Sequence, residues 1–237
     1  MSDKTKDLFG KAILDYQTDN NPQDLITETS ISESDEMSVK YLFRSFREMP
    51  QIEKLALEMA KGHILDVGCG AGSHSLYLQD RKMHVTAIDI SPNAIAACKL
   101  RGILDAKVSD INHITDNFDT ILLLMNGAGM CGKLKNLPKF LSKLKSILLP
   151  GGQILLDSSD IIYMFDEDDD GGKWIPSEND YYGEVVFHIS YKGENDVPFN
   201  WMYIDYQTLE NAALQAGFKC EMVSQGEHYD YLARLSH

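Results

Sequence analysis

The segment that decides the fold runs from Ile64 to Leu76 and has the sequence ILDVGCGAGSHSL. It begins with a short apolar run, passes through Gly68, Gly70 and Gly72, and continues in a pattern typical of a helix. Glycine at these positions allows a tight turn and lets a ligand approach backbone atoms that a β-carbon would shield. Because open α/β sheets bind ligands at the carboxyl ends of their strands, we expect a ligand site here.

Short apolar runs alternate with helix-like segments after this loop, a pattern typical of βα units around a parallel sheet. The expected strands are His63–Val67, His84–Asp89, Ala106–Ser109, Asp119–Met125 and Gly152–Asp157. Apolar residues at helical spacing predict helices over 134–149 and 208–218, and Pro150-Gly151-Gly152 should end the first of them. Residues 219–227 and 229–235 are expected to close the sheet as an antiparallel pair.

The spacing of the glycines argues against an NAD site. The dinucleotide fingerprint G-x-G-x-x-G would place its last glycine at position 73, which is Ser73 in this chain. Asp66 stands two residues before Gly68, at the strand end that faces the loop, where a carboxylate is poorly suited to a negatively charged pyrophosphate. Such an acid suits a cofactor that carries an ammonium group and a sulfonium.

The loop Asp66-Val-Gly-Cys-Gly-Ala-Gly72 resembles the D-x-G-x-G-x-G loop of class I S-adenosylmethionine-dependent methyltransferases. Four further blocks follow in the family's order: the strand that ends at Asp89, the acid Asp110, the strand Phe118–Asn126 and the junction 148–156. The resemblance covers residues 41–160 strongly and 204–237 weakly. It implies a Rossmann-like, doubly wound, seven-stranded α/β sheet, mostly parallel with an antiparallel last strand, and S-adenosylmethionine as cofactor.

The resemblance also implies which residues hold the cofactor. They are, in chain order, Arg44, Asp66, Gly68, Cys69, Gly70, Gly72, Asp89, Ile90, Asp110, Ile111 and Asn126. Asp66 would hold the ammonium group, and Asp89 would accept hydrogen bonds from both ribose hydroxyls. Asp110 would bind the adenine amino group, with Ile90 and Ile111 as apolar walls on the ring.

Simpler alternatives stay open for several of these residues. Asp89 could cap the following helix, and Asp110 could be a turn residue. Arg44 could pair with the cofactor carboxylate or form a surface salt bridge. Cys69 is expected to fill space in the loop rather than act as a nucleophile.

Methyl transfer from a sulfonium is an in-line displacement with a good leaving group, so proximity, alignment and exclusion of water supply most of the catalysis. A general base is needed only if the acceptor must lose a proton. The candidates for a catalytic role are Asn126, Tyr181 and His188, with Asp157, Asp160 and Tyr182 as further polar residues near the sulfonium. Each has a plain alternative as a turn, packing or solvent-facing residue.

Two segments lie outside the alternating core. Residues 1–60 are expected to form an acidic leader, partly mobile over 1–40, followed by a helical cap. The second segment is an insertion at 161–203, which we expect to cover the substrate pocket. It belongs to the expected methyltransferase domain, residues 61–237.

The insertion contains the strand-like runs 185–191 and 199–205, which predict a β-hairpin. Its aromatic residues could form a substrate cap, a small core for the hairpin or a dimer contact; the principal ones are Trp174, Phe187, Phe199 and Trp201. The [D/N]-P-P-[Y/F] motif of amine methyltransferases is absent, because the chain has Asn126-Gly-Ala-Gly129 at that place. We therefore expect a small-molecule acceptor, and we keep a non-catalytic cofactor-binding subunit as the alternative.

Composition narrows the partners and the compartment. The chain has 22 Lys and Arg against 36 Asp and Glu, a formal charge of −14, which disfavours nucleic acid as a partner. Much of the excess lies in the leader and in the run Asp166–Asp170, so that argument is weaker for the core, and a protein or RNA substrate is only disfavoured. The four cysteines form no C-x-x-C pair and no cluster with histidine, so we expect reduced thiols and no metal site. We also expect a cytoplasmic protein without signal peptide or membrane span, which is a monomer or a homodimer.

Overall fold

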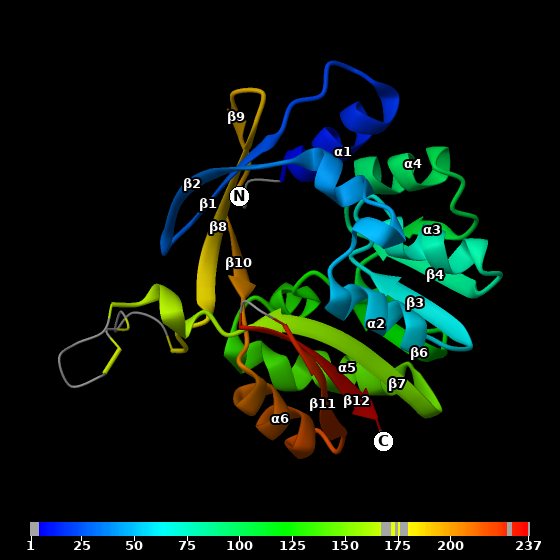
Figure 1. The fold of residues 1–237 in the computed structure, drawn as a ribbon, viewed down its shortest axis with the longest axis vertical. Coiled ribbons are helices and arrows are strands. Elements are labelled where there is room, and N and C mark those ends of the chain that lie inside the picture. Colours follow the sequence, from blue (N-terminus) through cyan, green and yellow to red (C-terminus); the bar gives the residue numbers. More distant parts are fainter. Residues whose placement is uncertain (1–4, 167–171, 174, 176–179, 227–228, 237) are drawn as a thin grey trace.

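The computed structural model describes residues 5–166, 172–173, 175, 180–226 and 229–236 and contains two sheets (Figure 1). The main sheet has seven strands in the order β11-β12-β7-β6-β3-β4-β5. Their bounds are β3 His63–Val67, β4 His84–Asp89, β5 Ala106–Val108, β6 Phe118–Leu123, β7 Leu148–Ser159, β11 Lys219–Gln225 and β12 Asp230–Ser236. Strands β3 to β7 pair in parallel, whereas β12 is antiparallel to both β7 and β11. This order confirms the predicted Rossmann-like fold.

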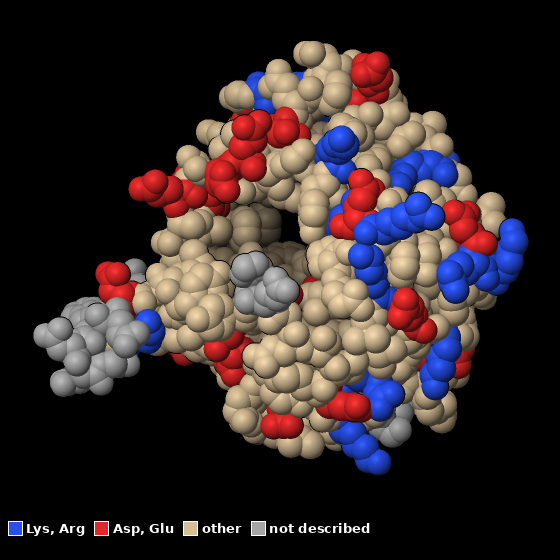
Figure 2. Space-filling view, in the orientation of Figure 1, with Lys and Arg blue, Asp and Glu red and all other residues tan. Residues whose placement is uncertain are grey.

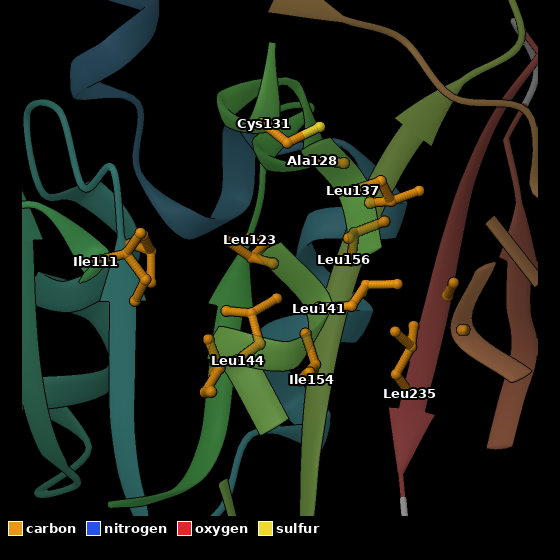
Figure 3. Packing of buried hydrophobic residues seen from close by; sticks show 14 of the residues in the cluster. Ile111, Leu123, Ala128, Cys131, Leu137, Leu141, Leu144, Ile154, Leu156 and Leu235 are labelled. Carbon is orange, nitrogen blue, oxygen red and sulfur yellow. The ribbon is translucent and has the colours of Figure 1, made fainter. Parts of the chain in front are cut away.

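Helices cover both faces of the main sheet. They are α2 Gln51–Met59, α3 Ser73–Asp80, α4 Pro92–Leu100, α5 Leu137–Ser146 and α6 Tyr206–Gln215. In β6, Ile121 and Leu123 lie in the apolar cluster that α5 and α6 complete, whereas Leu122, and Leu124 just after the strand, lie in the cluster of α2 and α3. Figure 3 shows the first of these clusters, with leucines of α5 packed against β6 and β7. Since successive side chains of a strand point to opposite faces, the apolar run in β6 needs helices on both.

A second, smaller sheet combines the insertion with the N-terminal segment. It has the order β10-β8-β1-β2, with a short β9 on β8. The bounds are β1 Leu25–Thr29, β2 Ser32–Met37, β8 Glu184–Tyr191, β9 Glu194–Asn195 and β10 Phe199–Met202. The antiparallel pairing of β8 with β10 confirms the predicted hairpin, and its second strand ends at Met202 rather than at 205.

The expectation of a partly mobile leader over 1–40 is wrong for the described part of that segment. Residues Leu8–Thr18 form helix α1, and the strands β1 and β2 follow it. The leader's acids are mostly exposed, as in β2, while Leu8, Ala12 and Leu25 are buried against Ile189 and Tyr191 of β8. Acidic composition therefore marks the solvent side of this segment, and a narrow apolar stripe holds it in place.

Three smaller expectations also differ from the structure. The helical cap before β3 is broken into 3₁₀ helices η1 (Val39–Phe43) and η2 (Phe46–Glu48) and helix α2, and Pro50 separates η2 from α2. The helix expected over 134–149 is 3₁₀ helix η5 (Leu134–Asn136) followed by α5. Strand β7 begins at Leu148 and passes through the Pro-Gly-Gly stretch, where its register against β6 shifts. Most of the acidic run Asp166–Asp170, and Trp174, lie outside the described residues.

Helix α1 connects the two sheets. It packs against α4, so closely that a β-carbon on Gly10 would collide with the Ser91 hydroxyl, and its other side packs on β8. The small sheet therefore stands over the carboxyl ends of the main strands, and Figure 2 shows a hollow between the two parts. Across the part of the chain that the structure describes, none of the helices is both long and apolar enough to traverse a bilayer.

Gly72, which precedes α3, tests how tightly the glycine loop is packed. Its φ is +78°, and an added β-carbon would collide with the Ile103 side chain and lie 2.9 Å from Cys98 Sγ. We expect Gly72→Ala to lower the free energy of unfolding by roughly 3 kcal/mol, from backbone strain plus overpacking. Chemical denaturation measures this change.

Gly102→Ala is the matched control, because Gly102 also has a positive φ, +89°, but an added β-carbon there would have no neighbour within 4 Å. It should cost only the backbone term of about 1–2 kcal/mol. Equal losses in the two variants would contradict tight packing at Gly72.

Candidate active site

The glycine loop is bonded to the end of the neighbouring strand β4. Gly68, Gly70 and Gly72 all have positive φ, at 70°, 53° and 78°, a region that favours glycine. The N–H groups of Gly68 and Cys69 donate to the carbonyl of Ile88 at 2.9 and 3.0 Å. The loop therefore has a fixed shape at the point where the strand order reverses, which is where doubly wound sheets bind their ligands.

Asp89, the last residue of β4, faces this loop with both carboxylate oxygens held. Oδ2 accepts the N–H of Gly70 at 2.9 Å, and Oδ1 accepts the N–H of Ser91 at 2.9 Å. The Ser91 hydroxyl itself caps α4 by accepting the N–H of Ala94, so Asp89 is not the cap of that helix. Burial raises the pKa of Asp89 against the effect of these hydrogen bonds. Each carboxylate oxygen keeps capacity to accept a further bond.

Asp66 points into the protein below the loop. Its side chain is buried and accepts the Ser75 hydroxyl at 2.6 Å, which joins the end of β3 to the first turn of α3. Cys69 is also buried, and its contact with the Cys98 thiol together with burial raises its pKa, so it fits the predicted role of a filler. The distance between these two sulfur atoms is 3.8 Å.

The residues predicted around adenine lie at the ends of β4 and β5. Asp110 Oδ1 accepts both the backbone N–H and the side-chain amide of Asn112 at 2.8 Å, so the predicted turn role is present. Ile111 is buried in the main core, whereas Ile90 is 71% exposed. An isoleucine this exposed beside the half-buried Asp89 offers an apolar surface for a flat ring.

Arg44 lies in a buried ion-pair cluster rather than in a surface salt bridge. Its guanidinium contacts both oxygens of Glu53 at 2.5 Å and the Tyr41 carbonyl at 2.8 Å. Glu53 also accepts a 2.8 Å hydrogen bond from His74, and although burial raises its pKa, His74 and Arg44 lower it on balance. The Nε of Arg44 is buried without a partner among the described residues. This leaves one N–H of a fixed cation for a ligand's acceptor.

Asn126 is held by three hydrogen bonds within the fold. Its backbone N–H donates to Asp157 at 2.9 Å, its side-chain oxygen accepts the Ser158 hydroxyl at 2.6 Å, and its amide donates to the Met202 carbonyl at 3.3 Å. Its φ of 60° follows a φ of 59° at Met125, so the chain turns sharply after β6. Asn126 thus joins β6, β7 and β10, and these bonds fit a structural role.

The two tyrosines of the insertion are likewise held by carboxylates. Tyr181 is buried, donates to Asp205 Oδ2 at 2.6 Å and accepts the N–H of the same residue at 2.9 Å. Tyr182 donates to Asp160 at 2.8 Å. Burial raises the pKa of both hydroxyls, so neither is a ready proton acceptor. These contacts fit the packing alternative.

His188 lies on the outer face of the small sheet. In β8 it alternates with Phe187 and Ile189, and Ile189 packs on α1, so His188 points the other way and is exposed. This position does not fit a general base at the carboxyl ends of the main strands. Periodicity alone left open which face of the hairpin would be turned inward.

Two neighbours of the glycine loop were not predicted. A β-carbon on Gly68 would lie 3.4 Å from the Met130 sulfur, in 3₁₀ helix η4 (Gly127–Cys131), and one on Gly70 would lie 3.9 Å from Ile13 of α1. Ile13 lies in the apolar stripe of α1, which was a usable signal, whereas nothing in the local sequence marks Met130. The described residues contain no group of three or more His, Cys, Asp or Glu side chains placed to hold a metal.

The comparisons with known proteins agree with this geometry. A family model described as a methyltransferase domain matches residues 59–230, more than half of the chain. The chain belongs to this methyltransferase family. A solved S-adenosylmethionine-dependent methyltransferase from Bacteroides fragilis, in complex with S-adenosyl-L-homocysteine, is 48% identical with a TM-score of 0.90, over 98% of this chain and 94% of that chain. The predicted class I S-adenosylmethionine-dependent family is thereby confirmed.

More distant relatives differ in acceptor. A ubiquinone biosynthesis O-methyltransferase from Xanthomonas euvesicatoria is 27% identical over 111 residues, 43% of this chain and 45% of that protein. A ribosomal RNA small subunit methyltransferase A from a Mycobacterium species is 44% identical over 63 residues, 27% of this chain and 21% of that protein. This methyltransferase chain spans less than half the length of these curated relatives. The CcbJ methyltransferase of Streptomyces caelestis, at 13% identity over 81% of this chain and 94% of that chain and a TM-score of 0.61, shares the fold.

Asp157, beside the Arg44 cluster, gives this family member a testable pH dependence. Burial raises its pKa to about 7, and the charge of Glu53 adds to this. When an acidic group has a higher pKa in the folded protein than in the unfolded chain, the folded state binds more protons between these two pKa values. The free energy of unfolding therefore falls as the pH rises through that range. From about pH 5 to about pH 8, Asp157 should therefore lower the free energy of unfolding by about 2–3 kcal/mol.

Asp157→Asn removes the titrating carboxyl group but keeps an oxygen that can accept the Asn126 N–H. The free energy of unfolding of this variant should therefore fall less than that of the wild type over the same pH range. Urea denaturation at each pH measures the difference. Asp35→Asn, on the exposed strand β2, is the control and should follow the wild-type profile. Parallel profiles for Asp157→Asn and wild type would contradict a buried, protonated Asp157.

Proposed function

We propose that the chain transfers a methyl group from S-adenosylmethionine to a small-molecule acceptor. The observation that carries this proposal is that Asp89 is hydrogen-bonded to the glycine loop. The N–H groups of Gly70 and Ser91 each donate to one of its two carboxylate oxygens and so orient the carboxylate. An oriented carboxylate with acceptor capacity at the end of β4 suits a pair of vicinal hydroxyls. The family match and the related structure with bound S-adenosyl-L-homocysteine support the proposal.

The residues of the site fit this cofactor. Gly70 leaves open space on its α-carbon, because only Ile13 lies within 4 Å of a β-carbon built there. The buried, unpartnered Nε of Arg44 offers a donor for the amino acid carboxylate. The exposed Ile90 supplies an apolar face for adenine, with Asp110 at the end of the next strand. Asp66 accepts one hydrogen bond from Ser75 and is buried below the loop, so it would act on the ammonium group as a nearby charge or through a water.

The bound cofactor would supply the methyl group on a positively charged sulfur. The chain's own contribution is to orient both reactants and to exclude water from the hollow. Helix α1 and the small sheet border that hollow opposite the main sheet (Figures 1 and 2). The residues Asn126, Tyr181 and Tyr182 act as supports for its walls, since each is bonded to a neighbouring element.

A small neutral or cationic acceptor is favoured over RNA by the charge around the entrance. Figure 2 shows Asp and Glu gathered on the lobe beside the hollow, where β2 carries Glu33, Asp35 and Glu36. Carboxylates at an entrance repel a phosphate backbone. Nanomolar RNA affinity at physiological salt would contradict this choice. A cytoplasmic location and a monomer or homodimer remain predictions.

A cofactor-binding subunit without transferase activity is the second candidate. It is favoured by one observation: the side chains proposed as catalytic groups are bonded to the fold or, like His188, point away from the hollow. Release of S-adenosylhomocysteine with any acceptor from a metabolite library would exclude this candidate.

Calorimetric titration with S-adenosyl-L-homocysteine tests the proposed cofactor site. We expect Asp89→Ala to weaken binding by roughly tenfold or more, because the ribose hydroxyls lose their acceptor. Asp89→Asn should lie between, since the amide oxygen can still accept one bond.

Glu33→Ala, on the exposed strand β2, is the control and should bind like the wild type. Far-UV circular dichroism must show that each variant is folded. Failure of the folded wild type to bind, or unchanged affinity in folded Asp89→Ala, would overturn the proposed cofactor site.

A further inference from the structure

We propose that Phe187, Phe199 and Trp201 form an aromatic wall that binds the methyl acceptor by its ring face, so that the acceptor is a flat aromatic molecule. The inference rests on the proposed methyl transfer, and it names the class of acceptor. It is carried by the position of these three rings relative to the glycine loop.

The three rings share one face of the β8–β10 hairpin. Phe199 pairs directly with Phe187 in register, and Trp201 pairs with Val185, so all lie on the same side of the sheet. Ile189 and Tyr191 continue that side along β8 and are buried against α1. The face with the rings is therefore the inner face of the small sheet.

Two elements bracket this wall, and both also reach the glycine loop. At one end, α1 packs on Ile189 and Tyr191 and brings Ile13 next to Gly70. At the other end, Trp201 lies so close to η4 that a β-carbon on Gly129 would collide with its ring, and Met130 of η4 lies next to Gly68. Phe187 sits between these two anchors. The inner face of the β8–β10 hairpin thus lies between two elements that contact the glycine loop, and the hairpin borders the hollow (Figures 1 and 2).

The wall differs from a closed hairpin core in its exposure. Tyr191, on the same face under α1, is 1% exposed, whereas Phe199 is 39% exposed and Phe187 and Trp201 are half-buried. Phe187 stacks on Phe199 with centroids 5.8 Å apart and meets Trp201 edge-to-face at 6.5 Å. Rings fixed in this way and left open to a hollow provide both a stacking face and an edge for another aromatic ring.

Chemistry at the wall favours an aromatic occupant over other apolar ones. Tyr203 completes the group, with its ring centroid 6.5 Å from that of Phe187, so four aromatic side chains gather at one place. Aliphatic ligands gain only burial from such a surface, whereas an aromatic ligand gains a further 0.5–1.5 kcal/mol or so from ring geometry, roughly 2- to 13-fold in affinity. If the acceptor is aromatic, the protein should therefore bind an aromatic ring more tightly than the saturated ring of the same size.

Trp201 provides the signal for a direct test. The chain has two tryptophans, so Trp174→Phe leaves Trp201 as the reporter. With S-adenosyl-L-homocysteine saturating, the probes are phenol, catechol and indole, each beside its saturated counterpart cyclohexanol, cyclohexane-1,2-diol or octahydroindole. We expect at least one aromatic probe to change Trp201 emission saturably and to bind roughly threefold or more tighter than its counterpart.

Variants of Phe199 separate stacking from bulk hydrophobicity. Phe199→Leu should remove most of the ring preference, and Phe199→Tyr, which keeps a ring, should retain it. Phe140→Leu, in α5 and outside the aromatic wall, is the control and should leave it unchanged. Equal affinity for rings and saturated counterparts, no response to any aromatic probe at millimolar concentration, or an unchanged preference in folded Phe199→Leu would overturn the inference.

Calorimetry of S-adenosyl-L-homocysteine, done first on the same Trp174→Phe protein, keeps the two proposals apart. Loss of cofactor binding would contradict the proposed function. Cofactor binding without ring preference would contradict the aromatic wall alone.

Discussion

The N–H of Gly70 donates to the Asp89 carboxylate, and this bond joins the ends of two adjacent parallel strands. It needs the left-handed backbone of the glycine loop, which turns the amide toward β4. It also holds a half-buried carboxylate, whose pKa is raised by desolvation and whose second oxygen accepts the N–H of Ser91. The remaining structure is arranged around this point: α4 begins just after it, α1 covers it, and the small sheet stands over it.

The cap over the site depends on contacts between distant segments of the chain. Strand β1 pairs with β8 through Ile26 and Ser190, so the N-terminal segment and the insertion form one sheet. Helix α1 then fastens this sheet to α4, where Asp7 accepts from both the backbone and the side chain of Asn93. Helix α1 therefore contacts both the glycine loop and the inner face of the small sheet.

Much of the main sheet could be predicted because its signals are local. Strands β3 and β4 match the predicted runs, and the glycine loop and Asp89 follow from their own spacing. The small sheet could be predicted only in part: the β8–β10 hairpin has strong strand periodicity, whereas β1 and β2 are short and acidic and gain their stability from β8. Tertiary pairing over long sequence separations leaves little trace in such segments.

Side-chain roles were predictable where one strand end decides them and unpredictable where several elements meet. Arg44 is held by Glu53, which is held in turn by His74, and that cluster exists only once α2 and α3 pack together. Asn126 stood out as a polar residue after β6, but its bonds to Ser158 and Met202 come from other strands. The sequence therefore marked polar residues at strand ends, whereas the bonds that hold Asn126, Tyr181 and Tyr182 come from other elements and could not be predicted from local spacing.

A crystal structure of the chain with S-adenosyl-L-homocysteine tests the central claim most directly, because it shows what Asp89 binds. The account predicts both ribose hydroxyls within hydrogen-bond distance of the Asp89 oxygens, and the ligand's amino acid end between the glycine loop and Arg44. A ligand bound elsewhere, or a ribose without contact to Asp89, would contradict it.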